Sequence, residues 1–211
     1  MNTTRRKRRD GVATRERLVE AAITILGREG LDALSTVNIA KEAGTAQSGL
    51  YMHFDSLEAL SVLAAERVGR RVREPLRAEM ARFRAGQTDD PAFYAAHYEN
   101  LLSTLAREWR FLELLMRYRR EPSPLGRVLA EAMAQVERDV ALHLLELGRP
   151  AGLRDDHLPR LSLYAHLLTL LMIGAAEASA DDPPADAKRR AADLARHVGV
   201  LVRDVYQTVL E

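Results

Sequence analysis

The sequence predicts an all-α protein of three short helices followed by six longer ones. Apolar residues recur at helical spacing along nearly the whole chain, and no stretch keeps the alternation of a strand. Turn signals and prolines separate the helical runs, as at residues 86–91, 121–124, 148–156 and 180–186. The 211 residues, 47% of them hydrophobic, suffice for an ordinary domain and a small second one.

Two short helices are expected first. One begins at a cap on Thr14 and ends at Gly30, where a helix commonly stops. The next runs from about residue 36 to residue 43, with Ser35 or Thr36 as its cap. Its inward-facing side chains are predicted to be Val37, Ile39, Ala40 and Ala43.

A glycine turn leads to a third helix. Gly44 breaks the second helix in the left-handed conformation that glycine tolerates. Residues 44–54, GTAQSGLYMHF, then form a helix of about two turns. A fourth helix follows, with Asp55 and Glu58 spaced as in a capping box, and Pro75 is expected to end it or bend it. The remaining helices are predicted at about residues 91–106, 109–119, 124–147, 156–179 and 184–210.

The overall charge points to no polyanionic partner, because 31 basic residues face 30 acidic ones. Any attraction to nucleic acid therefore depends on how the charge is distributed. One cationic run is present, and it reads either as a disordered, solvated tail or as an arm that meets phosphates. The run consists of Arg5, Arg6, Lys7, Arg8 and Arg9.

Other compositional features narrow the class of protein. The chain has no cysteine, which excludes disulfides and thiolate metal sites. No apolar stretch follows the amino-terminal cations, so a secretory signal is not expected and a cytoplasmic location fits. The longest apolar run, residues 167–176, is too short for a membrane span of about 20 residues and is interpreted as a buried helix.

The third helix is expected to present a neutral polar face. Helices two and three form a helix-turn-helix if their apolar side chains close a small core against the first helix. Those side chains are Ile39, Ala43, Leu50 and Phe54. The side chains left outward are small or neutral hydrogen-bonding groups, namely Thr45, Gln47, Ser48, Tyr51 and His53.

Such a face suits DNA. The amide of Gln47 can pair both its polar atoms with an adenine edge, and hydroxyl groups can touch bases or phosphates. The alternative is that Tyr51, His53 and Phe54 pack in an aromatic cluster that joins the third helix to the fourth.

Residues 14–60 closely resemble the DNA-binding domain of the TetR family of transcriptional regulators. The resemblance rests on a Gly-Leu turn after the first helix, Thr-x-x-Ile-Ala in the second, Ala-Gly at the turn, Leu-Tyr-x-His-Phe closing the third, and Ser-x-Glu-x-Leu opening the fourth. It covers about a quarter of the chain. It implies a dimer, operator DNA bound by the paired third helices, and release when a small molecule binds.

The resemblance also implies roles for residues. Thr36 would hold a phosphate, residues 45–48 would face bases, and Tyr51 and His53 would grip the DNA backbone. The implied organisation is a disordered basic arm at residues 1–11, a DNA-binding domain at 12–72 with its helix-turn-helix at about 35–54, and a ligand-binding and dimerisation domain at 73–211.

The sequence departs from the family pattern at two positions. Ala46 stands where the family often has a serine cap, so Thr45 would cap the third helix instead. Leu57 stands where a lysine usually contacts phosphate. We expect the arginine-rich arm, lying along the adjacent minor groove, to compensate.

The last two helices carry broad apolar stripes. The stripes fit a four-helix interface between two copies, which the resemblance also implies, or else they are core within one chain. The positions assigned to the dimer interface are Leu161, Ala165, Leu168, Leu194, Val198, Leu201, Val202 and Val205.

A ligand pocket is expected where aromatic and flexible residues concentrate, at residues 93–102 and 108–118. Apolar walls with a few polar tips are typical of small-molecule pockets, although the same spacing is found in plain core. The candidate pocket residues are Tyr94, His97, Tyr98, Trp109, Met116, Met133, His143, Tyr164 and Met172. An apolar or weakly polar effector fits this set.

Two other classes are weighed against a regulator. Nothing favours an enzyme, because residues 155–157 lack a second histidine at metal-ligand spacing and no nucleophile motif or phosphate loop occurs. Neither a cofactor nor a metal is expected. A helical adaptor that has lost DNA reading is the other alternative, favoured by the uncharged third helix and Leu57. The sequence thus predicts a homodimeric repressor that leaves a palindromic operator when a small apolar ligand binds.

Overall fold

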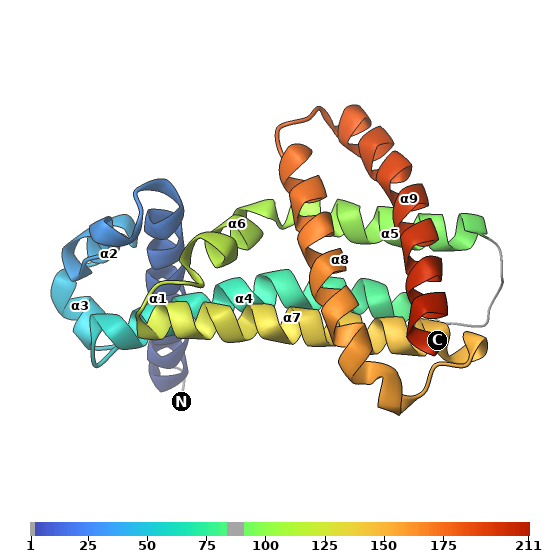
Figure 1. Cartoon of the computed structure of the whole chain (residues 1–211). Coiled ribbons are helices and arrows are strands. Elements are labelled where there is room, and N and C mark those ends of the chain that lie inside the picture. Colours follow the sequence, from blue (N-terminus) through green and yellow to red (C-terminus); the bar gives the residue numbers. More distant parts are fainter. Residues whose placement is uncertain (1–2, 84–90) are drawn as a thin grey trace. The chain divides into compact units, whose positions relative to one another are not determined.

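The computed structural model describes residues 3–83 and 91–211, with side chains from residue 11 onward except those of residues 91–94 and 184. The described residues form helices and turns and no strand, which confirms the predicted all-α fold (Figure 1). Its helices are α1 (Thr3–Arg28), α2 (Thr36–Glu42), α3 (Gln47–Tyr51), α4 (Leu57–Arg82), α5 (Pro91–Arg107), α6 (Trp109–Tyr118), α7 (Pro124–Gly148), α8 (Leu158–Ala178) and α9 (Pro184–Leu210). Short 3-10 turns lie at Leu31–Ala33, Arg149–Ala151 and Asp155–His157.

The chain divides into two compact units. The first unit comprises residues up to 70 together with residues 113–131, and the second comprises residues 71–112 and 132–211. The end of α6 and the start of α7 thus belong to the same unit as the amino-terminal helices. The domain boundary expected from the sequence, between residues 72 and 73, placed them in the larger domain. The reason is local packing, since the buried hydroxyl of Tyr118 donates to the carbonyl of Leu26 in α1 at 3.1 Å.

The first unit is built around α1, α2 and α3 (Figure 1). Leu18, Ile23 and Ile39 are fully buried and form the centre of its core. On the surface, Arg67 of α4 bridges Glu16 of α1 at 2.6 Å. Other buried side chains of this core are Val19, Ala22, Ile25, Leu26, Ala40, Leu50 and Phe54.

The start of α1 corrects the expected arm. The helix begins at Thr3, not at the predicted cap Thr14, so the backbone of residues 3–11 is helical where a disordered segment was expected. Arginine and lysine are good helix formers, and no proline interrupts the run, which explains why the helix extends toward the amino terminus. The side chains of Arg5, Arg6, Lys7, Arg8 and Arg9 lie outside the described residues.

The cap expected for α4 is wrong, and of the two alternatives for Pro75 the structure contradicts the end of the helix. Ser56, not Asp55, caps the helix, because its hydroxyl accepts from the amide of Ala59 at 3.0 Å. Pro75 lies inside α4 without ending it. A proline removes one backbone hydrogen bond, and the burial of Val72 and Leu76 on either side of it favours continuation of the helix.

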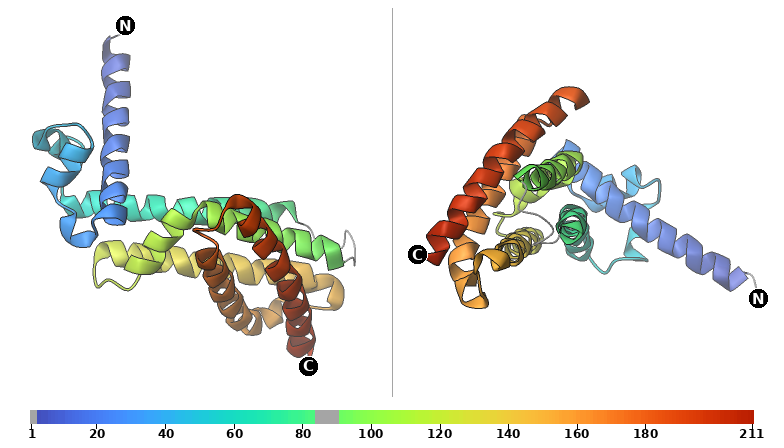
Figure 2. Two further views of the ribbon diagram at one scale, coloured as in Figure 1. Left: turned by 90° about the horizontal axis from the view of Figure 1, so that it is seen from above. Right: turned by 90° about the vertical axis from the view of Figure 1, so that its right-hand side faces the viewer.

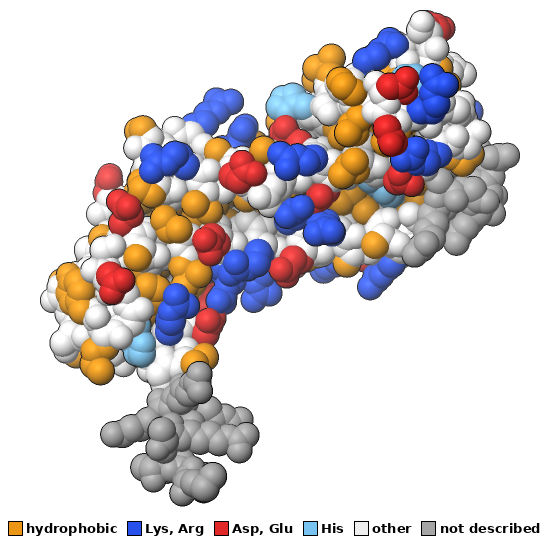
Figure 3. All heavy atoms as spheres, turned by 90° about the horizontal axis from the view of Figure 1, so that it is seen from below, with side chains coloured by type: hydrophobic (Ala, Val, Ile, Leu, Met, Phe, Trp, Pro, Cys, Tyr) orange, Lys and Arg blue, Asp and Glu red, His pale blue; other side chains and the backbone are white. Residues whose placement is uncertain are grey.

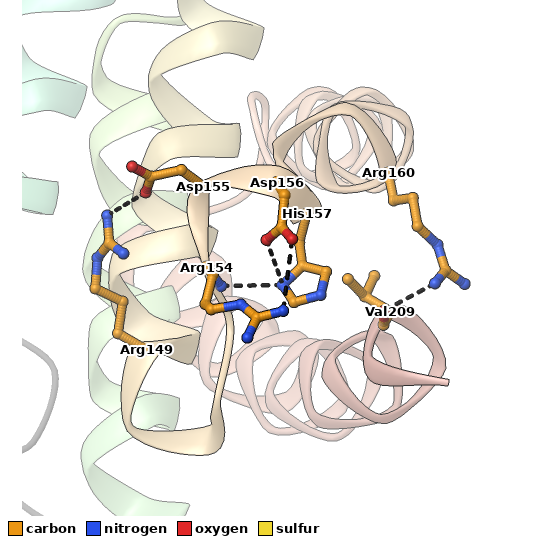
Figure 4. A network of polar contacts seen from close by, with 7 residues as sticks. All are labelled: Arg149, Arg154, Asp155, Asp156, His157, Arg160 and Val209. Carbon is orange, nitrogen blue, oxygen red and sulfur yellow. Dashed lines mark hydrogen bonds and ion pairs between the residues drawn. The ribbon is translucent and has the colours of Figure 1, made fainter.

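In the second unit α5 contacts both α8 and α9 (Figure 2). Leu161 and Ala165 of α8 and Ala195 of α9 are fully buried in this core. Arg160 joins the start of α8 to the end of α9, since its guanidinium donates to the carbonyl oxygens of Thr208 at 2.7 Å and Val209 at 2.8 Å (Figure 4).

The connection from α7 to α8 is held by short-range polar contacts (Figure 4). Arg149 bridges Asp155 at 2.8 Å. The amide of Arg154 donates to Nδ1 of His157 at 2.9 Å, which closes the turn before α8. These groups therefore have a structural role, and the acidic-histidine sequence at residues 155–157 belongs to the turn.

One face of α8 is more exposed than the sequence predicts. The segment Asp155–Ala178 is, among the described residues, the one helix long and apolar enough by length and composition to cross a membrane, and 33% of its most apolar window is buried. The helix predicted to be buried is therefore buried on one face only, with Thr169, Met172 and Ile173 on that face. Core helices of soluble proteins pass the same test. The exposed side chains are Leu163, Leu167, Leu170 and Leu171.

Candidate nucleic-acid interface and ligand cavity

The turn between α2 and α3 is formed as a helix-turn-helix requires. The hydroxyl of Ser35 caps α2 by accepting from the amide of Asn38 at 3.2 Å. Gly44 has φ of 65°, the left-handed conformation predicted for it, and its amide donates to Lys41. The amide of Thr45 then donates to the carbonyl of Ala40 at 2.9 Å, which closes the turn.

The two faces of α3 differ as predicted. Leu50 is fully buried and Phe54 is 5% exposed, and both belong to the core that includes Ile39 and Ala43. The predicted outward residues remain accessible: Gln47, Ser48 and Tyr51 are exposed, and Thr45 and His53 are half-buried. The alternative, in which Tyr51 is packed into an aromatic cluster, does not fit its 56% exposure.

Two apolar residues on this surface were not singled out by the sequence reading. Met52 is 83% exposed at the end of α3. Val37 is 58% exposed, although it was predicted to face inward. It lies in the first turn of α2, two residues before buried Ile39, and helical geometry places positions two apart on different faces. Helical spacing around Ile39 was the signal that could have shown this.

Gln47 is bound to α2. Its side-chain Nε2 donates to the hydroxyl of Thr36 at 2.7 Å. Ala46 occupies the cap position of α3 and makes no side-chain cap hydrogen bond, so the expectation that Thr45 caps instead is not met. The Thr45 hydroxyl lies 2.7 Å from where a Cβ on Gly49 would stand, so a glycine at position 49 leaves room for it.

Positive charge near α3 comes from α1. The guanidinium carbon of Arg15 lies 4.8 Å from the ring centre of Phe54, so an exposed cation lies close to the segment that follows α3. The sequence reading missed Arg15, because its neighbourhood depends on how α1 packs on α3. On the face drawn in Figure 3, basic and acidic side chains are interspersed.

A short turn between two helices, with a buried inner face and a neutral polar outer face on the second, defines a DNA-binding helix-turn-helix protein. Residues 18–62 match the family described as bacterial regulatory proteins, tetR family. Residues 18–62 therefore form a helix-turn-helix domain of the tetR family.

Two curated proteins are similar over part of the chain. The uncharacterized HTH-type transcriptional regulator YvdT of Bacillus subtilis is 43% identical over 51 residues, which cover 24% of this chain and 26% of that protein. The uncharacterized HTH-type transcriptional regulator Rv0681 of Mycobacterium tuberculosis is 36% identical over 103 residues, covering 44% of this chain and 45% of that protein. The chain thus matches less than half the length of either relative.

Solved structures share the fold over nearly the whole chain. A proposed transcriptional regulator of Pseudomonas aeruginosa PAO1 superposes with a TM-score of 0.69 at 21% identity, covering 92% of each chain. A TetR-like transcriptional regulator of Rhodococcus sp. RHA1 gives a TM-score of 0.60 at 19% identity, covering 88% of this chain and 93% of that one. At these identities the likeness shows the fold alone.

The second unit encloses an apolar cavity. About 40 Å³ inside it can take the centre of a water molecule, so the cavity is narrow. Val72, Leu76 and Met80 of α4 form one wall. The other walls include Leu101 and Leu105 of α5, Leu112 of α6, Val136 and Leu144 of α7, and Ile173 of α8.

The structure divides the predicted pocket residues. Tyr98, Met133, His143 and Met172 line the cavity. His97 contacts it through His143. The lining does not include Trp109, Met116 or Tyr164, and the side chain of Tyr94 lies outside the described residues.

The α4 wall was missed because the expected break at Pro75 hid the apolar stripe of Val72, Leu76 and Met80.

The cavity has a paired imidazole in its wall. Nε2 of His97 and Nε2 of His143 are 2.7 Å apart, and the ring of His97 stacks on Phe83 with 4.0 Å between centres. Burial and the neighbouring His143 lower the pKa of His97 to about 3. Burial lowers the pKa of His143 to about 4. Both rings are therefore neutral near pH 7, and one donates to the other.

Several residues assigned to the dimer interface are core of the single chain instead. Leu161, Ala165, Val198 and Val202 are buried, and Leu168 lines the cavity. Leu194 and Val205 are half-buried, while Leu201 is 49% exposed. The sequence showed an apolar stripe on each helix. It did not show which residues of the stripe pack within the same chain. Leu163, Leu167, Leu170 and Leu171 of α8 and Val200 of α9 are exposed and were missed.

Among the described residues, no group of three or more histidine and acidic side chains could hold a metal ion.

Proposed function

We propose that this protein binds a palindromic operator as a homodimer in the cytoplasm and represses the adjoining gene until a small apolar ligand releases it. The observation that carries the proposal is the division of α3 into a buried side, with Leu50, and an exposed side, with Gln47 and Ser48. A merely solvated helix face typically carries charge, whereas this one offers amide and hydroxyl groups.

The proposed contacts follow from the residues on that face. Gln47 reads an adenine edge, because its amide oxygen and its second amide hydrogen remain for a base while the first hydrogen is held by Thr36. Ser48 touches a base or phosphate, and Tyr51 and His53 donate to phosphate oxygens. Arg15 and the basic arm, residues 5–9, add the sequence-independent attraction.

Fluorescence anisotropy tests the DNA-binding proposal. Labelled duplexes from the protein's own upstream region are titrated alongside scrambled duplexes of equal length, at several salt concentrations. We expect preferential binding to one upstream segment with an inverted repeat, weakening as salt rises. Equal affinity for every duplex, or no binding, would contradict the proposal.

A second copy of the chain is proposed to cover the exposed leucines of α8. Leu163, Leu167, Leu170 and Leu171 recur at helical spacing and form one stripe. Exposed apolar stripes of this kind mark interaction surfaces. A two-fold dimer also suits a palindrome, whose half-sites lie about 34 Å apart or a multiple of that distance.

Ligand-controlled release is supported by the cavity of the second unit. Its lining is mostly apolar, as in known small-molecule sites, and its free space of about 40 Å³ is narrow. A ligand that binds more tightly to the form of the dimer that cannot reach both half-sites would increase the population of that form. The dimer would then leave the DNA. Release of the labelled duplex on addition of a cavity ligand is the corresponding measurement.

The adaptor alternative has one observation in its favour. Val37, Tyr51 and Met52 make the helix-turn-helix surface partly apolar, and such side chains also suit a protein partner. The same side chains can contact thymine methyl groups. The anisotropy titration separates the two functions, because an adaptor shows no sequence-selective, salt-sensitive binding.

A further inference from the structure

The apolar cavity of the second unit carries an ionisable group at a distinct place in its wall. His143 and Met80 line the cavity and also line a neighbouring groove bounded by Arg77, Phe83 and Pro150. His143 therefore lies between an apolar interior and a more polar groove. A ligand that fills the cavity can bring its polar end to this histidine and keep its apolar body among aliphatic side chains.

The rest of the lining offers little else for a charged group. Thr169 donates its hydroxyl hydrogen to the carbonyl of Ala165 at 2.7 Å. Tyr98 is buried at 1% exposure beside His97 on α5. Most other lining residues are aliphatic or methionine. The histidine pair is therefore the part of the wall suited to an ionised group.

Fixed charges near the pair are engaged with one another. Asp139, which lines the groove with His143, is bridged by Arg73 at 2.6 Å and lies 3.8 Å from Arg77. Glu146 is bridged by Arg149 at 2.7 Å. The described lining from α5, α6 and α8 adds no Asp, Glu, Lys or Arg to the cavity. Within the cavity lining itself, a positive charge for an anionic ligand must then come from the imidazoles.

We propose that the cavity binds a slender apolar molecule with one weakly acidic head group, and that the His97–His143 pair takes up one proton to hold that head as an ion pair. The proposal rests on the ligand-binding role proposed above and names the ligand class and the residues that recognise it. The narrow cavity selects an unbranched or flexible apolar body.

The proton balance follows from the geometry of the pair. In the neutral pair one ring donates its Nε2 hydrogen to the other, and the donating ring carries its lone pair on Nδ1. A solvent proton added at that Nδ1 gives an imidazolium whose new N–H donates to the carboxylate. Without this proton, a buried carboxylate would lack a counter-charge and would be costly to desolvate.

Isothermal titration calorimetry of the full chain with decanoate and with decanol tests the proposal. Titrations near neutral pH in buffers of different ionisation enthalpy count the protons taken up. We expect uptake of about one proton per decanoate and none per decanol. Decanoate affinity should rise by up to about tenfold per pH unit as the pH is lowered from about 8 to about 6, with decanol unchanged.

Two matched variants locate the effect. His143→Gln retains hydrogen-bonding groups but takes no proton, so decanoate affinity should fall by about tenfold or more and proton uptake should vanish, while decanol affinity stays within about twofold. His197→Gln makes the same substitution at an exposed histidine of α9 that does not line the cavity, and should leave both affinities and the proton count unchanged. Thermal unfolding of each variant shows that it is folded.

The proposal would be overturned if decanoate and decanol bound with equal affinity and without proton uptake. It would also be overturned if neither compound bound to the wild-type chain. A His143→Gln protein that keeps the proton uptake would also overturn it. Operator binding is measured separately: decanoate that binds with proton uptake and leaves the duplex bound supports this site and contradicts ligand-controlled release.

Discussion

The side-chain amide of Gln47 in α3 donates a hydrogen bond of 2.7 Å to the hydroxyl of Thr36 in α2. This bond links the two helices of the helix-turn-helix through their exposed side chains and fixes one hydrogen of the amide. The resemblance assigned Thr36 to a phosphate. The Thr36 hydroxyl accepts a hydrogen bond from Gln47 and can still donate its own hydrogen to a phosphate oxygen. Thr36 can therefore orient the Gln47 side chain and also contact the DNA backbone.

Replacing Gln47 by Ala should relax base preference at one position by about 1 to 3 kcal/mol without unfolding the protein. Thr36→Val should produce a smaller loss of about 1 kcal/mol, because the amide remains but is no longer oriented. Anisotropy with operator variants measures both effects. Thr208→Val, in α9, is the control and should bind like wild type. An unchanged base preference in Gln47→Ala would show that this residue does not read DNA.

Tyr118→Phe should destabilise the protein by about 1 to 2 kcal/mol, because it leaves the buried carbonyl of Leu26 without this donor. Tyr51→Phe is the matched control. Its hydroxyl belongs to a residue that is 56% exposed, so stability should change by less than about 0.5 kcal/mol, while affinity for all duplexes falls. Urea unfolding measures the stabilities. Equal stabilities of the two variants would contradict the structural role of Tyr118.

Deleting residues 1–9 should weaken operator affinity and flatten its salt dependence. Five basic residues are lost from each subunit, so the slope of log affinity against log salt should fall by up to about 4.5 for each bound subunit. Replacing residues 5–9 by glutamine is the control for helix length, since it keeps the chain intact and should give the same slope as the deletion. An unchanged slope in both proteins would mean that the arm does not meet phosphates.

Leu167→Glu should convert the proposed dimer into a monomer, because it places a charge on the exposed α8 stripe. Operator affinity should then fall by about 100-fold or more, since the two half-sites are no longer bound together. Leu142→Glu, at a position on α7 that is 43% exposed, should leave the mass unchanged. Light scattering after size exclusion measures the mass. A Leu167→Glu protein that remains dimeric would place the interface elsewhere.

Stability should decrease as the pH falls from 6.5 toward about 4. The buried histidines have folded-state pKa values lowered to about 3 for His97 and about 4 for His143, so the unfolded chain binds more protons in this window. Each histidine contributes a loss of about 1 kcal/mol per pH unit. Urea unfolding across this range should show a shallower pH dependence for His143→Gln. An identical dependence would mean that the pair does not drive it.

Much of the fold could be predicted from the sequence, because helical spacing and turn residues act over short distances. The bounds of α5, α6, α7, α8 and α9 lie within about two residues of their predicted positions. Gly44 was placed correctly, since only glycine adopts its φ of 65° readily. The errors were also local: Ser56 competed with Asp55 for one cap, and flanking apolar residues carried α4 through Pro75.

The sites were predicted less well where several helix faces compete for one core. Periodicity marked the stripe of Leu161 and Ala165 but could not show that it faces inward while Leu163 and Leu167 remain exposed. Periodicity also favoured Trp109 and Tyr164 as pocket residues. Neither lines the cavity, and α4 supplies one of its walls. Both questions depend on contacts between residues far apart in the chain.

By itself the sequence determined the helical order and the polar face of α3, because each depends on residues within a few positions of one another. Tertiary packing decided the rest. It bonded Gln47 to Thr36, set Arg15 beside Phe54, and brought His97 and His143 together from two helices. A side chain acquires its partners and its pKa only when distant segments exclude water around it, and no local pattern records that.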